Sequence, residues 1–370
     1  MQSLLNRVPI LLLASALLLA TLMSCQKNES AAPAPAAPAE KASAPASEPA
    51  GCSDCVPVTP DNFVRAESDK YFALTVQQAG GIGKFHHDRE SAPVDKQLVV
   101  RGNLDTLYST GIWDLDAGPV TVTLPEAGKR FRSLMPITED QYVPAVYYNA
   151  GKYTFTREKI GTRYLFLAIR TLIDPNDPKD IEQAHALQDA TKTEQKSSGE
   201  FEVPKWDPVS QKKVHDALLV LFSTLSDQKG MFGSKQEVDP VHFLIGAAAL
   251  WGGNPEKAAI YLNVTPAKND GHTIYKLTAR DVPVDGFWSI SVYNAQGYFQ
   301  KNEYNAYSLN NVTAKKSDDG SVIVQFGSCD GKIPNCLPIV EGWNYTVRLY
   351  RPRAEILSGK WKFPEANPAS

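Results

Sequence analysis

The chain has 370 residues and a formal net charge of −3, with 38 lysines and arginines against 41 aspartates and glutamates. Hydrophobic residues make up 43% and charged residues 21%, an ordinary composition for a folded protein. No basic patch stands out, so we predict no nucleic-acid partner. Residues 52–370 are long enough to form two domains.

The N-terminus has the pattern of an export signal. Arg7 precedes an uncharged apolar stretch over residues 8–24, and these flanks are typical of a signal peptide. The stretch ends at Leu22-Met-Ser-Cys25, which resembles the lipobox of bacterial lipoproteins. The resemblance implies that residues 1–24 are removed and that Cys25 carries the lipid, with palmitate among its acyl chains. The alternative is an ordinary secretory signal with an incidental cysteine.

Residues 25–56 are expected to form a tether. Alanine and proline dominate this stretch, which lacks the apolar bulk to build a core and is kept extended by proline. Gln26, where inner-membrane lipoproteins usually have aspartate, resembles lipoproteins sent to the outer membrane. We therefore expect a cell-envelope protein whose partner is the lipid bilayer, facing the periplasm or the outside. No later apolar run is long enough to span a bilayer.

Four cysteines remain if Cys25 carries lipid, and an even number fits an oxidising compartment. We favour disulfides between Cys329 and Cys336, which lie close in one loop, and between Cys52 and Cys55. A four-cysteine zinc site and redox chemistry at Cys52-Ser-Asp-Cys55 are the alternatives.

The first half of the chain predicts one helix and then an antiparallel meander. Thr59-Pro-Asp-Asn62 has the residues of a helix start, and Gly80-Gly81 is a natural stop. Alternating or β-rich segments follow, as expected for half-buried strands. The predicted strands are 97–101, 120–124, 130–137, 141–148 and 164–170.

The second half returns from helix to strand. Residues 180–196 and 209–227 have helical spacing of apolar positions. Residues 239–263 are rich in small residues that would let two helices, or a helix and a sheet, approach closely. The last hundred residues predict strands at 273–279, 287–293, 321–326 and 345–350. This order gives a mainly β, α+β fold class.

Two regions resemble known families. The run Arg101-Gly-Asn-Leu-Asp-Thr-Leu-Tyr-Ser109 is similar to the hallmark of domain of unknown function family 1254, and His185-Ala-Leu-Gln-Asp189 fits further along. Gly252-Gly-Asn-Pro255, Phe287-Trp-Ser-Ile290 and Arg348-Leu-Tyr-Arg-Pro352 resemble the partner family 1214. The resemblance implies two β-sandwich-like antiparallel domains joined by helices, and it implies no established reaction.

The resemblance also gives the domain boundaries. We expect a 1254-like β domain at 57–200, a helical connector at 201–262 and a 1214-like β domain at 263–370. The chain departs from the second family where Cys336 precedes Leu337-Pro338, because a tryptophan usually stands there. The Cys329–Cys336 bridge would then replace an aromatic anchor.

The candidate ligand-binding residues begin in the first family motif. Arg101 and Asp105, near the end of a predicted strand, can point together. An arginine fork holds a carboxylate from a ligand or from the protein itself, so an anion pocket and a structural ion pair are both open. Tyr108 is the expected donor in such a pocket. Asn103 and Arg170 complete the candidate set.

Histidines give the candidate acid–base residues. His86 lies close to two carboxylates, which fits a general base, a metal ligand or a plain turn. His185 and Asp189 are four residues apart on a predicted helix, so their side chains should meet. They fit a proton-transfer pair or a surface contact. No complete metal site is identifiable, and we predict no cofactor.

These features leave three functions open. The first is a tethered envelope protein that binds a small polar molecule between its two β domains. The second is a hydrolase or isomerase with His86 or His185 as base, although no nucleophile or phosphate-loop motif is present. The third is a structural or assembly lipoprotein. The sequence favours no particular reaction and leaves a homo-oligomer open.

Overall fold

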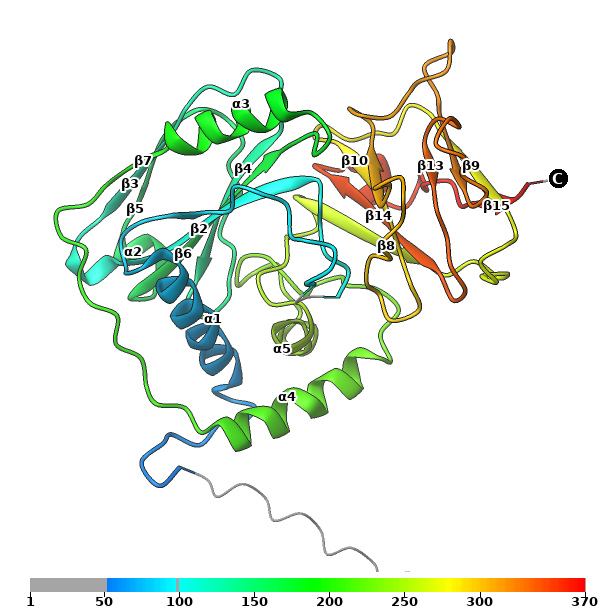
Figure 1. The fold of residues 1–370 in the computed structure, drawn as a ribbon. Helices are drawn as coiled ribbons and strands as arrows, with labels where there is room; N and C mark the ends of the chain where they lie inside the picture. Colours follow the sequence, from blue (N-terminus) through cyan, green and yellow to red (C-terminus); the bar gives the residue numbers. More distant parts are fainter. Residues whose placement is uncertain (1–51, 98–99, 370) are drawn as a thin grey trace, which may run out of the picture. The chain divides into compact units, whose positions relative to one another are not determined.

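The first β domain consists of two antiparallel sheets that pack face to face (Figure 1). The computed structural model describes residues 52–97 and 100–369. The larger sheet has the strand order β1-β2-β6-β4 and the smaller one the order β5-β3-β7. The strands are β1 His86–His87, β2 Thr106–Asp114, β3 Val120–Leu124, β4 Arg132–Thr138, β5 Gly151–Phe155, β6 Tyr164–Leu172 and β7 Lys192–Glu194. Trp113, Val122 and Leu167 lie in the core between the sheets.

The second β domain repeats this arrangement. One sheet has the order β11-β10-β14-β8 and the other β13-β12-β9-β15, and only β12 and β13 pair in parallel. The strands are β8 Ala259–Val264, β9 Tyr275–Ala279, β10 Trp288–Tyr293, β11 Ser308–Asn310, β12 Val322–Phe326, β13 Cys336–Leu337, β14 Asn344–Tyr350 and β15 Asn367–Pro368. Ile290, Val324 and Val347 lie in the core of this sandwich. The predicted fold class, mainly β with two sandwich-like domains, is confirmed.

Helices connect and cover the sheets. They are α1 Phe63–Ala79, α2 Arg157–Ile160, α3 Pro178–Asp189, α4 Pro208–Phe222, α5 Pro240–Ala249 and α6 Ala354–Leu357, with a 3-10 turn at Leu115–Ala117. Phe63, Leu218 and Ile245 bring α1, α4 and α5 together in one apolar cluster. The predicted N-terminal helix is confirmed, and it ends where Gly80 adopts the left-handed conformation.

Three predicted elements differ from the structure. Residues 141–148 form no strand, because Gln141 has a positive φ of 67° and Pro144 lacks the N–H that a ladder needs. The helix predicted over 180–196 ends at Asp189, since β-branched Thr193 and its neighbours pair with β3 instead. In the segment 97–101, of which residues 98 and 99 lie outside the described residues, Arg101 occupies a turn with a φ of 54°.

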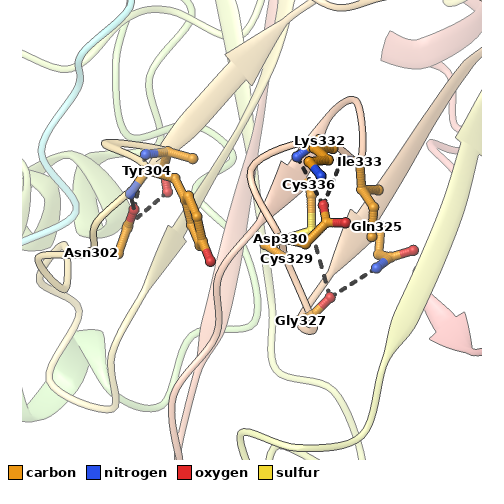
Figure 2. The surroundings of a disulfide bond; sticks show 10 residues. Asn302, Tyr304, Gln325, Gly327, Cys329, Asp330, Lys332, Ile333 and Cys336 are labelled. Carbon is orange, nitrogen blue, oxygen red and sulfur yellow. Dashed lines mark hydrogen bonds between the residues drawn. A yellow bond between two sulfur atoms is a disulfide. The ribbon is translucent and has the colours of Figure 1, made fainter.

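Both predicted disulfides are present. Cys52 pairs with Cys55 before α1, and Cys329 pairs with Cys336 across the loop between β12 and β13. Figure 2 shows Tyr304 beside this loop, and the Tyr304 ring lies so close to Gly331 that an added Cβ would meet it at 3.3 Å. The cysteines therefore form neither a four-cysteine zinc site nor a dithiol.

The two expectations about membranes concern the lipid anchor at Cys25 and a membrane-spanning helix. The signal peptide over 1–24, Cys25 and most of the tether lie outside the described residues. Among the residues that are described, no helix has the length and apolar character to cross a membrane. The domain boundaries at 200 and 262 stay predictions, and strand β8 spans the second of them.

Candidate functional site

A buried polar surface joins the two β domains. The β8–β10–β14 sheet lies between the first domain and the β9–β12–β13 sheet (Figure 1). On the side away from its sandwich core it carries Ser289, Ser291 and Arg348, each at most 3% exposed. Polar side chains on a sheet normally face water, so their burial shows that a second layer covers them. That layer is the segment before β2, from Arg101 to Asp105.

Asp105 lies at the centre of this contact. Its side chain is 1% exposed, and Ser289 donates a hydrogen bond of 2.5 Å to its Oδ2. Arg348 donates to the carbonyl oxygens of Arg101 and Gly102, at 2.9 Å each. Burial raises the pKa of Asp105, although Arg348 and Ser289 act to lower it. Asp105 is the only carboxylate in the segment from Arg101 to Asp105. It interacts with Arg348 and Ser289 of the second domain and so links the two domains.

Arg101 and Asp105 do not meet, contrary to the sequence-based expectation. Strand β2 begins only at Thr106, and the turn at Arg101 sends the two side chains to different strands. Arg101 donates from Nη1 to Thr346 Oγ1 at 3.0 Å, and its guanidinium lies 5.7 Å from the centre of the Tyr293 ring. The prediction of a structural ion pair between Arg101 and Asp105 is therefore wrong. Arg101 instead contacts the second β domain.

Arg170 and Tyr108 form the second part of the junction. They are direct cross-strand partners in β6 and β2, and the guanidinium lies 5.4 Å from the centre of the Tyr108 ring. Asn103 donates to the hydroxyls of Tyr108, at 3.1 Å, and Tyr350, at 3.3 Å. Arg170 is only 8% exposed, yet no described carboxylate lies within ion-pair distance of it.

The charge of Arg170 acts on phenols instead of carboxylates. Burial would lower the pKa of Arg170, but the hydroxyls of Tyr108, Tyr261 and Tyr350 raise it above its ordinary value. Burial would raise the pKa of Tyr108, but Arg170, followed by Asn103, lowers it below its ordinary value. Burial raises the pKa of Tyr350, so this phenol stays neutral and accepts the hydrogen bond from Asn103. The cluster is rich in donors and carries one positive charge without a protein counter-ion among the described residues.

A groove of about 600 Å³ borders one member of this cluster, Tyr261. Asn254 and Tyr261 line it, and Asn254 donates to the Tyr261 hydroxyl at 2.7 Å. The groove follows strand β8 between residues 225–229 and 356–365. Its volume falls within the range of small-molecule sites.

The candidate histidines lie elsewhere. His86 Nε2 is 3.2 Å from Asp88, and His87 Nδ1 is 2.7 Å from the buried Ser109 hydroxyl. His185 is bound to the carbonyl oxygen of Arg89 at 2.6 Å, while the Arg89 side chain pairs with Asp189. The expected contact between His185 and Asp189 is therefore replaced by Arg89. Among the described residues, no group of three or more acidic, histidine or cysteine side chains is arranged to hold a metal.

Several residues of the junction were not among the candidates from sequence. They are Asn254, Tyr261, Ser289, Arg348 and Tyr350, all from the second half of the chain. Asn254, Ser289, Arg348 and Tyr350 lie inside the motifs that resemble family 1214. These motifs were visible in the sequence, but they indicated a family and not the position of a site.

The fold defines a protein of two β-sandwiches joined by helices. Residues 82–195 match the family described as a protein of unknown function, DUF1254, and residues 260–354 match the protein of unknown function DUF1214. The chain therefore carries a DUF1254 region followed by a DUF1214 region, and the resemblance found in the sequence is confirmed.

A solved structure shares the fold. The VPA0106 protein from Vibrio parahaemolyticus matches with a TM-score of 0.67 and 17% identity, over 84% of this chain and 98% of that one. An uncharacterized protein from Burkholderia cenocepacia gives a TM-score of 0.48 at 12% identity, over 83% and 86%. At such identity the first likeness concerns the fold alone. Among curated proteins, none matches the chain.

Proposed function

We propose that the protein binds a small organic carboxylate at the junction of its two β domains, with Arg170 as the anchor. The observation that carries this proposal is the guanidinium of Arg170, which is 8% exposed and lacks a carboxylate partner among the described residues. A buried charge is costly unless it is paired. A bound carboxylate supplies that pairing through the two-pronged geometry that guanidinium favours.

The neighbouring side chains suit the same ligand. Tyr108 and Tyr261 offer hydroxyls, and Asn103 and Asn254 offer amide donors next to them. The groove beside Tyr261 provides room for the rest of the ligand. Asp105 does not compete for Arg170, because the groups that act on its carboxylate are Arg348, Ser289 and Asn310. The proposal is thus a donor-rich pocket with one free positive charge.

The binding test compares carboxylates with their neutral amides. Thermal unfolding and calorimetry on the full chain in detergent would use succinate, benzoate and longer carboxylates, each against the matching amide. A ligand at a hundred times its Kd adds about 2.7 kcal/mol to the free energy of unfolding. We expect a carboxylate to raise the Tm and Arg170→Met to abolish the rise. Equal binding by wild type and Arg170→Met would overturn the proposal.

Matched variants separate this function from a structural role. Tyr261→Phe removes a hydroxyl at the groove and should weaken binding, whereas Tyr153→Phe removes one that bonds Asn149 in another part of the domain. Without ligand, Arg170→Met should unfold no more easily than wild type, because it removes an unpaired buried charge. A large loss of stability with no ligand found would favour the structural or assembly role.

We also propose that the protein is a lipoprotein of the cell envelope, held to the bilayer by lipid on Cys25. The apolar stretch that ends at Cys25 and the proline-rich spacer after it support this, as do the two disulfides of the folded part. Metabolic labelling with an alkynyl palmitate should mark the wild-type chain in a bacterial host. Cys25→Ser should lose both the label and the membrane fraction. Labelling of Cys25→Ser at the wild-type level would contradict the anchor.

A further inference from the structure

A second arginine of the first domain is buried without a complete set of partners. Arg132, at the start of β4, is 3% exposed. Its Nη2 donates to Leu187 O at 3.0 Å and to Thr191 Oγ1 at 2.5 Å, at the end of α3. Its Nε and Nη1 are also buried, and neither has a hydrogen-bond partner among the described residues. Buried guanidinium nitrogens are normally satisfied, so this exception needs a cause.

The charge of Arg132 is uncompensated as well. Two residues earlier, Arg130 makes bonds of 2.8 and 2.6 Å to the two carboxylate oxygens of Asp180. No described carboxylate comes within ion-pair distance of Arg132, and burial alone lowers its pKa to about 10. It is nevertheless charged at neutral pH. The contrast with Arg130 shows that the domain pairs one partly exposed arginine with a carboxylate and leaves the more deeply buried Arg132 without one.

Arg132 lines a small polar pocket. The pocket has a volume of about 240 Å³ and is enclosed by the turn 124–128, Arg130 and residues 148–150. Its one carboxylate, Glu126, accepts a hydrogen bond from Gly128 N at 3.1 Å. The pocket is smaller than a typical organic ligand site, which suits a compact anion.

This pocket is distinct from the domain junction. In the β4–β6 ladder Arg132 pairs with Thr171, while Arg170 pairs with Ser133. Directly paired residues share a face and successive residues alternate, so the side chains of Arg132 and Arg170 leave the sheet on opposite sides.

We propose that this pocket binds a phosphate group, held by the open guanidinium nitrogens of Arg132. The charge is matched, Arg132 lines the pocket, and the volume admits a tetrahedral oxyanion. Arginine is well suited to phosphate because its fixed donors match the oxyanion geometry. The group can arrive as free phosphate or as the head of a phosphate ester, and the pocket chemistry is the same for both.

Calorimetry on the full chain, with inorganic phosphate and phenyl phosphate as probes at constant ionic strength, tests the proposal. We expect saturable binding of at least one probe, weakened more than tenfold in Arg132→Met and clearly weakened in Arg132→Lys, which keeps the charge but loses the open nitrogens. Tighter binding of phenyl phosphate identifies an ester ligand, and tighter binding of phosphate identifies the free ion. Either result supports the site.

Two controls keep the result interpretable. Arg163→Met removes an arginine that is already paired with Asp114 and should leave phosphate binding unchanged. Circular dichroism checks that each variant is folded, and Arg132→Lys covers the case in which Arg132→Met does not fold. Binding that is equal in wild type and Arg132→Lys, or that does not saturate, would mean an adventitious ion only and overturn the proposal.

Discussion

Asp105 of the first β domain accepts a hydrogen bond of 2.5 Å from Ser289 of the second, and both side chains are at most 1% exposed. This contact links residues that are 184 positions apart in the sequence. It places a carboxylate close enough to Arg348 to act on it, in a layer where water is excluded. The two domains are therefore joined by buried polar groups and not only by apolar packing.

Removing either partner should weaken the junction. Ser289→Ala leaves the Asp105 carboxylate short of one donor and should cost about 1–3 kcal/mol in urea unfolding. Asp105→Asn should cost more, since it also leaves Arg348 without its counter-charge. The double variant should be non-additive, because both changes act on one contact. As a control, the exposed Ser358→Ala should change stability by less than about 0.5 kcal/mol. A loss no larger than this in Ser289→Ala would contradict the role of the contact.

The sequence predicted the strands better than it predicted the junction. The alternation of Tyr345, Val347 and Leu349 with polar residues correctly placed one face of β14 in a core. The same alternation says nothing of Arg348, because a polar face on a strand is typically read as facing water. Only the tertiary contact with the segment before β2 shows that this face is buried too.

The candidate site residues show the same limit of local sequence patterns. Arg101, Asp105 and Tyr108 lie at the junction, but their partners come from the other domain and cannot be deduced from local spacing. His185 and Asp189 have the spacing of a contact pair, but Arg89, from a distant loop, bonds both. The local sequence pattern thus identifies the segments that carry the candidate residues, whereas long-range contacts determine which partners their side chains have.

Tyr108 should ionise at a lower pH than an ordinary tyrosine. Burial opposes this, but the cation of Arg170 and the donors around the hydroxyl lower the pKa. An ultraviolet titration of the wild type should therefore show an early tyrosine transition that is lost in Tyr108→Phe. Arg170→Met should move that transition to higher pH. Tyr350→Phe, which removes a phenol whose pKa is raised, should leave the early transition in place. An unchanged titration of Tyr108→Phe would contradict the assignment to Tyr108, and an unchanged titration of Arg170→Met would contradict the coupling to Arg170.

The disulfide in the β12–β13 loop should contribute more to stability than the N-terminal one. Replacing Cys329 and Cys336 by serine opens a loop with a separation of seven residues, which costs about 2.5 kcal/mol by chain entropy. The loop also packs on Tyr304, so loss of the disulfide should weaken this packing as well (Figure 2). The pair Cys52 and Cys55 closes a separation of three and should cost less. Chemical unfolding of the two double-serine variants checks the order, and a larger loss from the N-terminal pair would contradict it.

Asp69 should make the folded state less stable as the pH rises. It lies in α1 with 1% exposure and accepts a hydrogen bond of 2.8 Å from Trp206 Nε1. Burial raises its pKa to about 7; the bond from Trp206 opposes this rise and the nearby Glu139 adds to it. An unfolded aspartate ionises near about 3.9. The folded state therefore holds the proton over a pH range in which the unfolded state has lost it.

The sign of the effect follows from this difference. Between pH of about 4 and 7 the folded chain binds up to one more proton than the unfolded chain, so stability falls with rising pH by at most about 1.4 kcal/mol per unit. Above pH 7 both states are ionised and the penalty is complete. Urea unfolding from pH 4 to 8 should show this slope in wild type and lose it in Asp69→Asn. Asp270, whose pKa is lowered to about 2 by hydrogen bonds from the backbone of Thr273 and His272, is the opposite control. It favours folding above pH 4 and loses that effect as the pH falls towards 2, so Asp270→Asn should leave the slope between pH 4 and 7 intact. A slope that persists in Asp69→Asn would assign the proton to another group.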